Sequence, residues 1–167
     1  STAVNVTEDF GNVVVDDNAT KSITTITLNG FADATLGAGA SGSLNKLATL
    51  NLKNGQATGT TTLTSTVATL NVTLNDMAGT VDLDGAAATT LKTLNLTTTG
   101  EASTITLDAA KVETLTIAAG ADLDVSTSVA AGLAAVKTIT VTGAGDVNLG
   151  NLSTVASFTT LTASAAT

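Results

Sequence analysis

One short spacing recurs along the whole chain: an apolar residue, two further residues, and then apolar, polar, apolar. It returns every 20 to 24 positions. The copies begin at Ile23, Leu47, Val67, Leu91, Val112, Val136 and Phe158, with a partial copy at Val4 to Val6. Self-similarity at a fixed period is typical of repeat proteins, in which each unit buries its apolar face only against its neighbours. The spacing therefore restricts the chain to a stack of similar units.

A second alternating stretch follows most copies, for example at residues 81–84 (VDLD) and 105–108 (ITLD). Strict alternation rich in Val, Ile and Thr is typical of a half-buried strand, whereas a leucine-rich repeat would carry a helix there. We predict an all-β fold, a parallel β-solenoid (right-handed β-helix) with about 22 residues per coil. Each coil should have two main strands and a short corner strand. The predicted inward corner residues are Ile23, Leu47, Val67, Leu91, Val112, Val136 and Phe158.

The chain is predicted to form a single β-solenoid domain over residues 1–167, with a partial or atypical first coil at 1–22. Regular coils should occupy 23–157, and 158–167 should start a further coil. Because the chain begins without Met and stops one strand into a coil, we expect it to be a piece of a longer secreted protein. The composition, 43% hydrophobic but only 2% aromatic, suits a thin layered core in which aliphatic side chains stack in columns.

The outward positions of the first strand form two polar columns. The first column consists of Thr25, Thr49, Thr69, Thr93, Thr114, Thr138 and Thr160. The second consists of Thr27, Asn51, Asn71, Asn95, Thr116, Thr140 and Thr162. The simplest interpretation is an exposed sheet face on which stacked Thr and Asn side chains hydrogen-bond their equivalents. Two alternatives are an ice-binding face, similar to the Thr-x-Thr rows of insect-type antifreeze proteins, and a saccharide-binding face, which the scarcity of aromatic residues disfavours.

Acidic residues concentrate on the second strand of the coils and at its ends. They are Asp82, Asp84, Asp108, Asp122, Asp124 and Asp146. Carboxylates stacked about 5 Å apart repel one another, and a hard cation such as Ca²⁺ would relieve that repulsion. The alternative is a solvated acidic face that keeps the protein soluble and discourages wrong stacking. Calcium at these aspartates is the one cofactor that the sequence suggests.

Several function classes are disfavoured by composition. The chain has no His and no Cys, which excludes the usual nucleophilic triads and thiolate metal sites. A net charge of −8, with scattered lysines, argues against nucleic acid as a partner. No stretch approaches a transmembrane helix in length, so we do not expect a membrane-embedded protein. Paired aspartates could serve a polysaccharide-active β-helix enzyme, but no charged trio converges in the sequence, and we assign no catalytic residue.

The tandem motifs at residues 91–96 (LKTLNL) and 112–117 (VETLTI), in a chain rich in Thr, Ala, Gly and Asn, carry a resemblance. The sequence resembles the crystalline surface-layer (S-layer) proteins and large type I-secreted repeat adhesins of Gram-negative bacteria. This resemblance implies an extracellular β-solenoid, export by a type I route, calcium-assisted assembly, and a lattice-forming or adhesive role. The calcium-binding nonapeptide of such proteins is not recognisable here, which places calcium dependence in question.

From the sequence we therefore expect a non-catalytic building block of an extracellular surface layer or surface assembly on the bacterial cell. Its expected partners are other copies of itself and cell-surface polysaccharide. The main alternative is an ice-binding or glycan-binding β-solenoid adhesin domain, and a polysaccharide-active β-helix enzyme ranks below it.

Overall fold

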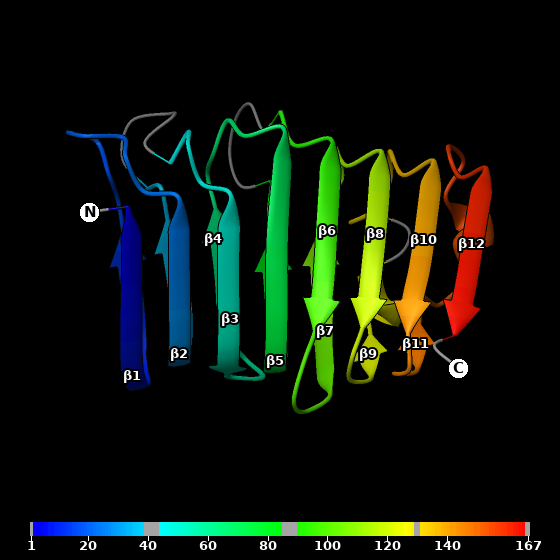
Figure 1. Cartoon of the computed structure of the whole chain (residues 1–167), viewed down its shortest axis with the longest axis horizontal. Helices are drawn as coiled ribbons and strands as arrows, with labels where there is room; N and C mark the ends of the chain where they lie inside the picture. The colour runs from blue at the N-terminus through cyan, green and yellow to red at the C-terminus, as the bar shows by residue number, and fades with distance from the viewer. Residues whose placement is uncertain (1, 39–43, 85–89, 129–130, 166–167) are drawn as a thin grey trace.

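The chain folds into a β-solenoid of about seven turns with about 22 residues per coil, as predicted. The computed structural model describes residues 2–38, 44–84, 90–128 and 131–165. All strand pairs in these ranges are parallel, and successive coils stack side by side along the long axis of the molecule (Figure 1). The two termini lie at opposite ends of the stack (Figure 1).

Two walls of strands enclose the core. The first wall follows the order β1-β2-β3-β5-β6-β8-β10-β12. Its strands are β1 (Ala3–Val15), β2 (Thr25–Leu36), β3 (Thr49–Gly55), β5 (Thr69–Asp82), β6 (Thr93–Thr98), β8 (Thr114–Ala119), β10 (Thr138–Gly143) and β12 (Thr160–Ala165). The second wall contains β4 (Thr60–Leu63), β7 (Ser103–Asp108), β9 (Leu123–Asp124) and β11 (Val147–Asn148), joined by the last residues of β1, β2 and β5.

Helix is confined, within the described ranges, to two short 3₁₀ turns, η1 (Ser126–Ser128) and η2 (Leu152–Thr154). The apolar–polar alternation of the sequence explains this outcome, because each coil must present one face of each strand to a shared core. Residues 105–108 form a strand in β7, and Val81 and Asp82 end β5, whereas Leu83 and Asp84 lie just beyond it; neither segment is the helix of a leucine-rich repeat.

The core consists of stacked aliphatic columns, and Ile26, Leu50, Leu94, Leu115 and Ile139 are fully buried in it. Each such side chain contributes roughly 1.5–3 kcal/mol before chain entropy is subtracted. The predicted corner residues also face inward, in irregular backbone before each first-wall strand rather than in a third strand. Five are buried, namely Ile23, Leu47, Leu91, Val112 and Val136, whereas Val67 and Phe158 are half-buried.

The register of one strand pair differs from the sequence prediction. The repeat spacing placed Leu70 over Leu50, but Leu50 pairs with Val72, and Leu70 pairs with Leu94 in the next coil. The coil from Leu50 therefore has 22 residues rather than 20, and β5 begins two residues before the position that pairs with the first residue of β3. A shift by two residues keeps every side chain on its original face, so the inward apolar pattern could not reveal it.

The bend between the walls uses left-handed backbone at one equivalent position of successive coils. The ladder registers align Phe10, Gly30, Asn54 and Asp76 at this position, with φ angles of 56°, 69°, 52° and 51°. Gly, Asn and Asp tolerate this conformation, whereas Phe adopts it only at an energetic cost. The bend lets β1, β2 and β5 continue from the first wall into the second.

Candidate functional site

The second wall brings three of the six predicted aspartates together. Asp82 and Asp108 are ladder partners at the ends of β5 and β7, and Asp84 lies two residues beyond β5. One carboxylate oxygen from each lies within 4.8 Å of the other two. We call Asp82, Asp84 and Asp108 the acidic cluster. Oxygens that share one Ca²⁺ at 2.3–2.6 Å lie at most about 5 Å apart, so this spacing fits a calcium ion.

Backbone amides hold the acidic cluster in place. The Asp84 N–H donates to Asp82 Oδ1 at 3.1 Å, and the Ala110 N–H donates to Asp84 Oδ2 at 3.1 Å. Partial burial raises the pKa of Asp82, and the charges of Asp108 and Asp84 raise it further. Partial burial likewise raises the pKa of Asp108, with Asp84 adding to the effect. The acidic cluster thus brings like charges together, and no ion pair among the residues that the structure describes neutralises them.

The other three predicted aspartates are held separately from the cluster. Asp122 accepts a hydrogen bond from the Asp146 N–H at 2.8 Å. Asp124 accepts hydrogen bonds from the Ser126 N–H at 2.8 Å and from Asn148 Nδ2 at 3.1 Å. Hydrogen bonds from Ser126 lower the pKa of Asp124. Asp122 and Asp124 therefore stabilise a turn and the contact between neighbouring coils. The six predicted aspartates do not form one row but divide into separate groups.

The first wall carries a regular polar array, which we call the threonine face. It covers β5, β6, β8, β10 and β12, whose pairings run without a register shift. Its three columns are Thr69, Thr93, Thr114, Thr138 and Thr160; Asn71, Asn95, Thr116, Thr140 and Thr162; and Thr73, Thr97, Ala118, Thr142 and Ser164. None of these side chains is charged.

The predicted threonine column is interrupted before this array. Thr25 and Thr49 are ladder partners, but Thr49 pairs with Asn71 rather than with Thr69, as a result of the register described above. The threonine column predicted from Thr25 to Thr160 is therefore wrong as a continuous row. The column is continuous only from Thr69 onward, because from there each threonine pairs with the threonine of the next coil.

Hydrogen bonding across the threonine face is uneven. Asn95 Nδ2 donates to Asn71 Oδ1 at 2.9 Å, so the predicted side-chain ladder exists between asparagines. Among the described residues, however, the hydroxyls of Thr93, Thr116 and Thr140 have no hydrogen-bond partner in the protein. These hydroxyls point outward from the wall and are free to bond water or a ligand.

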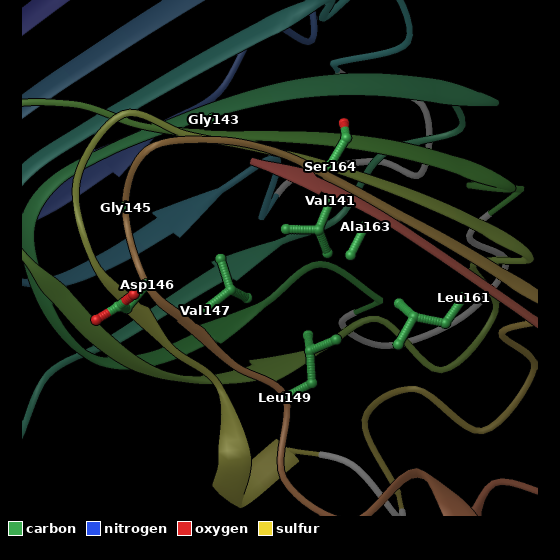
Figure 2. A pocket seen from close by; sticks show the side chains of 9 residues that line it. All are labelled: Val141, Gly143, Gly145, Asp146, Val147, Leu149, Leu161, Ala163 and Ser164. Carbon is green, nitrogen blue, oxygen red and sulfur yellow. The ribbon is translucent and has the colours of Figure 1, made fainter. Parts of the chain in front are cut away.

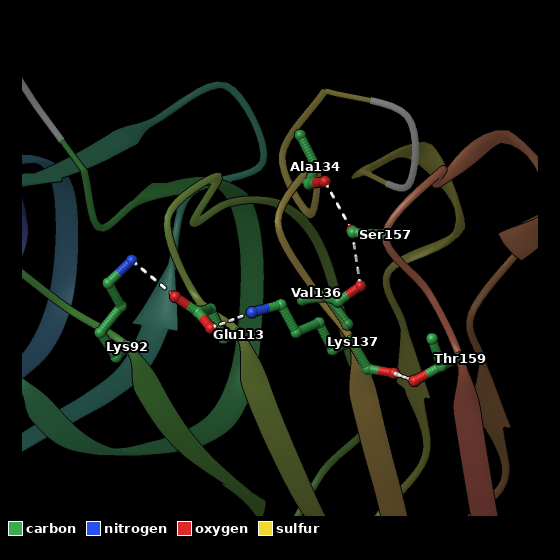
Figure 3. A network of polar contacts seen from close by, with 7 residues as sticks. All are labelled: Lys92, Glu113, Ala134, Val136, Lys137, Ser157 and Thr159. Atoms are coloured by element: carbon green, nitrogen blue, oxygen red, sulfur yellow. Dashed lines mark hydrogen bonds and ion pairs between the residues drawn. The ribbon is translucent and has the colours of Figure 1, made fainter.

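A second feature, missed by sequence reasoning, is a charged column on the corner that precedes the first wall (Figure 3). Glu113 bridges two lysines, with Oε1 at 2.8 Å from Lys92 Nζ and Oε2 at 2.5 Å from Lys137 Nζ. Hydrogen bonds from Lys137 and then Lys92 lower the pKa of Glu113 to about 2. The signal was present in the sequence, because all three residues occupy the second position of the repeat motif.

The same corner continues into the last coil through uncharged contacts (Figure 3). Ser157 Oγ lies 2.8 Å from the carbonyl oxygens of both Ala134 and Val136, which share its one hydroxyl proton, and Thr159 Oγ1 donates to the Lys137 carbonyl at 2.9 Å. Stacked corners are thus fixed by side chains as well as by the strand ladder.

An open hollow of about 310 Å³ lies beside β12 (Figure 2). Val141, Val147, Leu149 and Leu161 direct apolar side chains toward it, and Asp146 lies at its margin (Figure 2). Leu161 is 49% exposed, although its column neighbour Ile139 is fully buried. The hollow is thus the open face of the core column at this end of the described residues, and its lining does not bring together groups suited to acid–base chemistry.

Comparisons with protein-family models, with curated proteins and with solved structures gave no match. In the described part of the chain, no helix is both long and apolar enough to span a membrane.

Proposed function

We propose that this chain is a non-catalytic structural segment of an extracellular bacterial surface assembly, such as a surface layer. In this proposal the threonine face contacts other copies of the protein. The observation that carries the proposal is the unbroken register of β5, β6, β8, β10 and β12, which places short, uncharged side chains at the same positions of each strand.

Two properties of the threonine face support a contact role. Short Thr and Asn side chains lose less conformational entropy when a partner covers them than Lys or Glu would. The face also carries no charge, so two copies could approach there despite a net charge of −8 on each chain. The charged residues Lys92, Glu113 and Lys137 lie beside the face at the corner, where they would form a polar rim.

Calcium-assisted assembly is the second part of the proposal. The acidic cluster offers closely spaced carboxylate oxygens, and Asp82 and Asp108 have raised pKa values because they are partly buried near like charge. A bound Ca²⁺ would remove this repulsion and join the coil of β5 to that of β7.

Analytical ultracentrifugation and electron microscopy test the contact role. We expect the wild-type chain to form concentration-dependent ordered assemblies. The double variant Thr116→Lys/Thr140→Lys should remain monomeric, because it places two like charges at the centre of the face. Thr104→Lys, on the exposed surface of the second wall, is the matched control and should assemble normally. A wild-type chain that stays monomeric at every concentration would refute the proposal.

A second candidate, ice binding, is favoured by the unpartnered hydroxyls of the threonine face. Strands about 4.8 Å apart, with outward residues roughly 6.6 Å apart along each strand, form a regular grid of hydroxyl groups. Thermal hysteresis of the monomer, lost in the Thr116→Lys/Thr140→Lys variant, would favour this candidate. Assembly without thermal hysteresis would favour the structural role.

A further inference from the structure

A hollow of about 280 Å³ lies at the bend between the two walls, and its lining includes no residue of the threonine face or the acidic cluster. Phe10 lines it together with Asn54, Gln56 and Asp76, which come from later coils. Phe10 is 52% exposed, in a chain with only three aromatic residues. An exposed aromatic ring beside amide and carboxylate groups is an arrangement that core packing does not require.

The backbone at Phe10 is strained. Its φ of 56° is left-handed, which costs an ordinary side chain roughly 1–2 kcal/mol. The equivalent position in the next coils is occupied by Gly30, Asn54 and Asp76, all residue types that tolerate this backbone. Because about half of the residue is exposed to solvent, burial offsets little of the strain. Retained strain of this kind points to a role for the ring outside the folded core.

The polar groups around the ring are available to a ligand. Asn54 uses Nδ2 to donate to Asn29 Oδ1 at 2.7 Å, which leaves its own Oδ1 as an acceptor. Within the ranges that the structure describes, the Gln56 amide and the Asp76 carboxylate have no side-chain partner. The hollow therefore presents one aromatic face, an amide with donors and acceptors, and two further acceptors.

We propose that this hollow is a saccharide subsite that holds one pyranose ring of a neutral or amino-sugar glycan. The C–H face of the sugar would pack on the Phe10 ring, while the sugar hydroxyls hydrogen-bond to Gln56, Asp76 and Asn54. The Asp76 carboxylate and the net charge of −8 disfavour uronic acids and other acidic sugars. This site is independent of the proposed assembly, because its residues lie outside the threonine face.

Isothermal titration calorimetry and saturation-transfer NMR on the full chain test the proposal. The probes are tetrasaccharides of β-1,4-glucose, β-1,4-N-acetylglucosamine, α-mannose and galacturonate. We expect at least one of the first three to bind weakly and galacturonate not to bind. Phe10→Gly should abolish binding, whereas Phe10→Tyr should keep it within a few-fold. Gln56→Ala and Asp76→Asn should each weaken it about tenfold, the loss typical of one hydrogen bond.

Val14→Thr, an exposed position on the same strand, is the matched control and should bind like the wild type. Thermal melting of Phe10→Gly distinguishes a binding role from a structural one. Since glycine relieves the strained backbone, we expect the melting temperature to stay the same or rise. Binding of none of the four probes, undiminished binding by Phe10→Gly, or a large fall in its melting temperature would each overturn the proposal. Sedimentation of Phe10→Gly reports separately on assembly.

Discussion

The two walls of the solenoid are built from the same coils, yet they differ in regularity and charge. On the first wall, five consecutive strands from β5 to β12 keep one register and present neutral side chains. On the second wall, β9 and β11 are only two residues long, and the acidic cluster lies at the ends of β5 and β7. The comparison indicates that one wall preserves a repeated surface while the other accommodates differences in coil length and residue type.

The largest expected change in the free energy of unfolding comes from substitutions in the core that both walls share. Leu115→Ala on the first wall and Leu107→Ala on the second should each lower the free energy of unfolding by about 2–5 kcal/mol, because both side chains are buried and their removal leaves a cavity. Urea denaturation measures this change. The outward control Thr114→Ala should change it by less than about 0.5 kcal/mol. A small loss at only one of the two leucines would mean that the walls do not share one core.

A smaller change in the free energy of unfolding, of opposite sign, is expected for a substitution on the second wall. Thr61 of β4 is 1% exposed, and among the described residues its hydroxyl has no hydrogen-bond partner. Thr61→Val keeps the shape and removes the buried polar group, so it should stabilise the fold by about 1–2 kcal/mol. Thr62→Val, the outward neighbour, is the control and should have little effect. If Thr61→Val destabilises the protein in urea denaturation, the hydroxyl must be bonded.

The acidic cluster predicts that the second wall responds to pH and to calcium. Raised pKa values mean that Asp82 and Asp108 favour the fold when protonated, below the ordinary value of 3.8, and lose that contribution as the pH rises through the raised values. At pH 7, Asp108→Asn should therefore stabilise the fold, by less than about 1 kcal/mol because solvent screens these charges. At pH 3 the difference should vanish.

The response of the melting temperature to calcium tests the acidic cluster further. Millimolar Ca²⁺ should raise the melting temperature of the wild type, and Asp82→Asn/Asp108→Asn should remove the response. Asp122→Asn, outside the cluster, is the control and should retain it. An equal melting temperature in calcium and in excess chelator would mean that the cluster is only a solvated acidic surface.

The smallest change in stability is expected at the charged corner that precedes the first wall. Glu113 has a pKa lowered to about 2 by Lys137 and Lys92, so its contribution is present above the ordinary value of 4.5 and is lost as the pH falls toward 2. Glu113→Gln should lower the melting temperature slightly at pH 7. The difference should shrink in 1 M salt and at pH 2. A difference that persists under both conditions would indicate a packing role instead.

The fold was largely predictable because a solenoid repeats its inward pattern in every coil, and each copy of the spacing is a separate observation of the same geometry. The register of β5 was not predictable from that pattern, since Leu70 and Val72 are both apolar and two residues apart. The length of a coil does not distinguish them either, because the paired coils vary from 21 to 24 residues.

The candidate sites were less predictable. Sequence reasoning named Asp82, Asp84 and Asp108 because they alternate with buried residues, but it could not separate them from Asp124, whose hydrogen bonds depend on local turns. The Phe10 hollow was not foreseen, because it joins a residue of the first coil to Asn54 and Asp76 in later coils. Contacts that skip a coil leave no periodic signal.

Cysteine cross-linking measures the register of the threonine face, on which the proposed contact role depends. The chain has no Cys, so an introduced pair reports only on itself. Thr116 and Thr140 are ladder partners, about 5 Å apart, and Thr116→Cys/Thr140→Cys should form an intramolecular disulfide under mild oxidation. Thr116→Cys/Thr142→Cys, offset by two residues to roughly 7–8 Å, should not. Efficient cross-linking of the second pair but not the first would contradict the register and the face built on it.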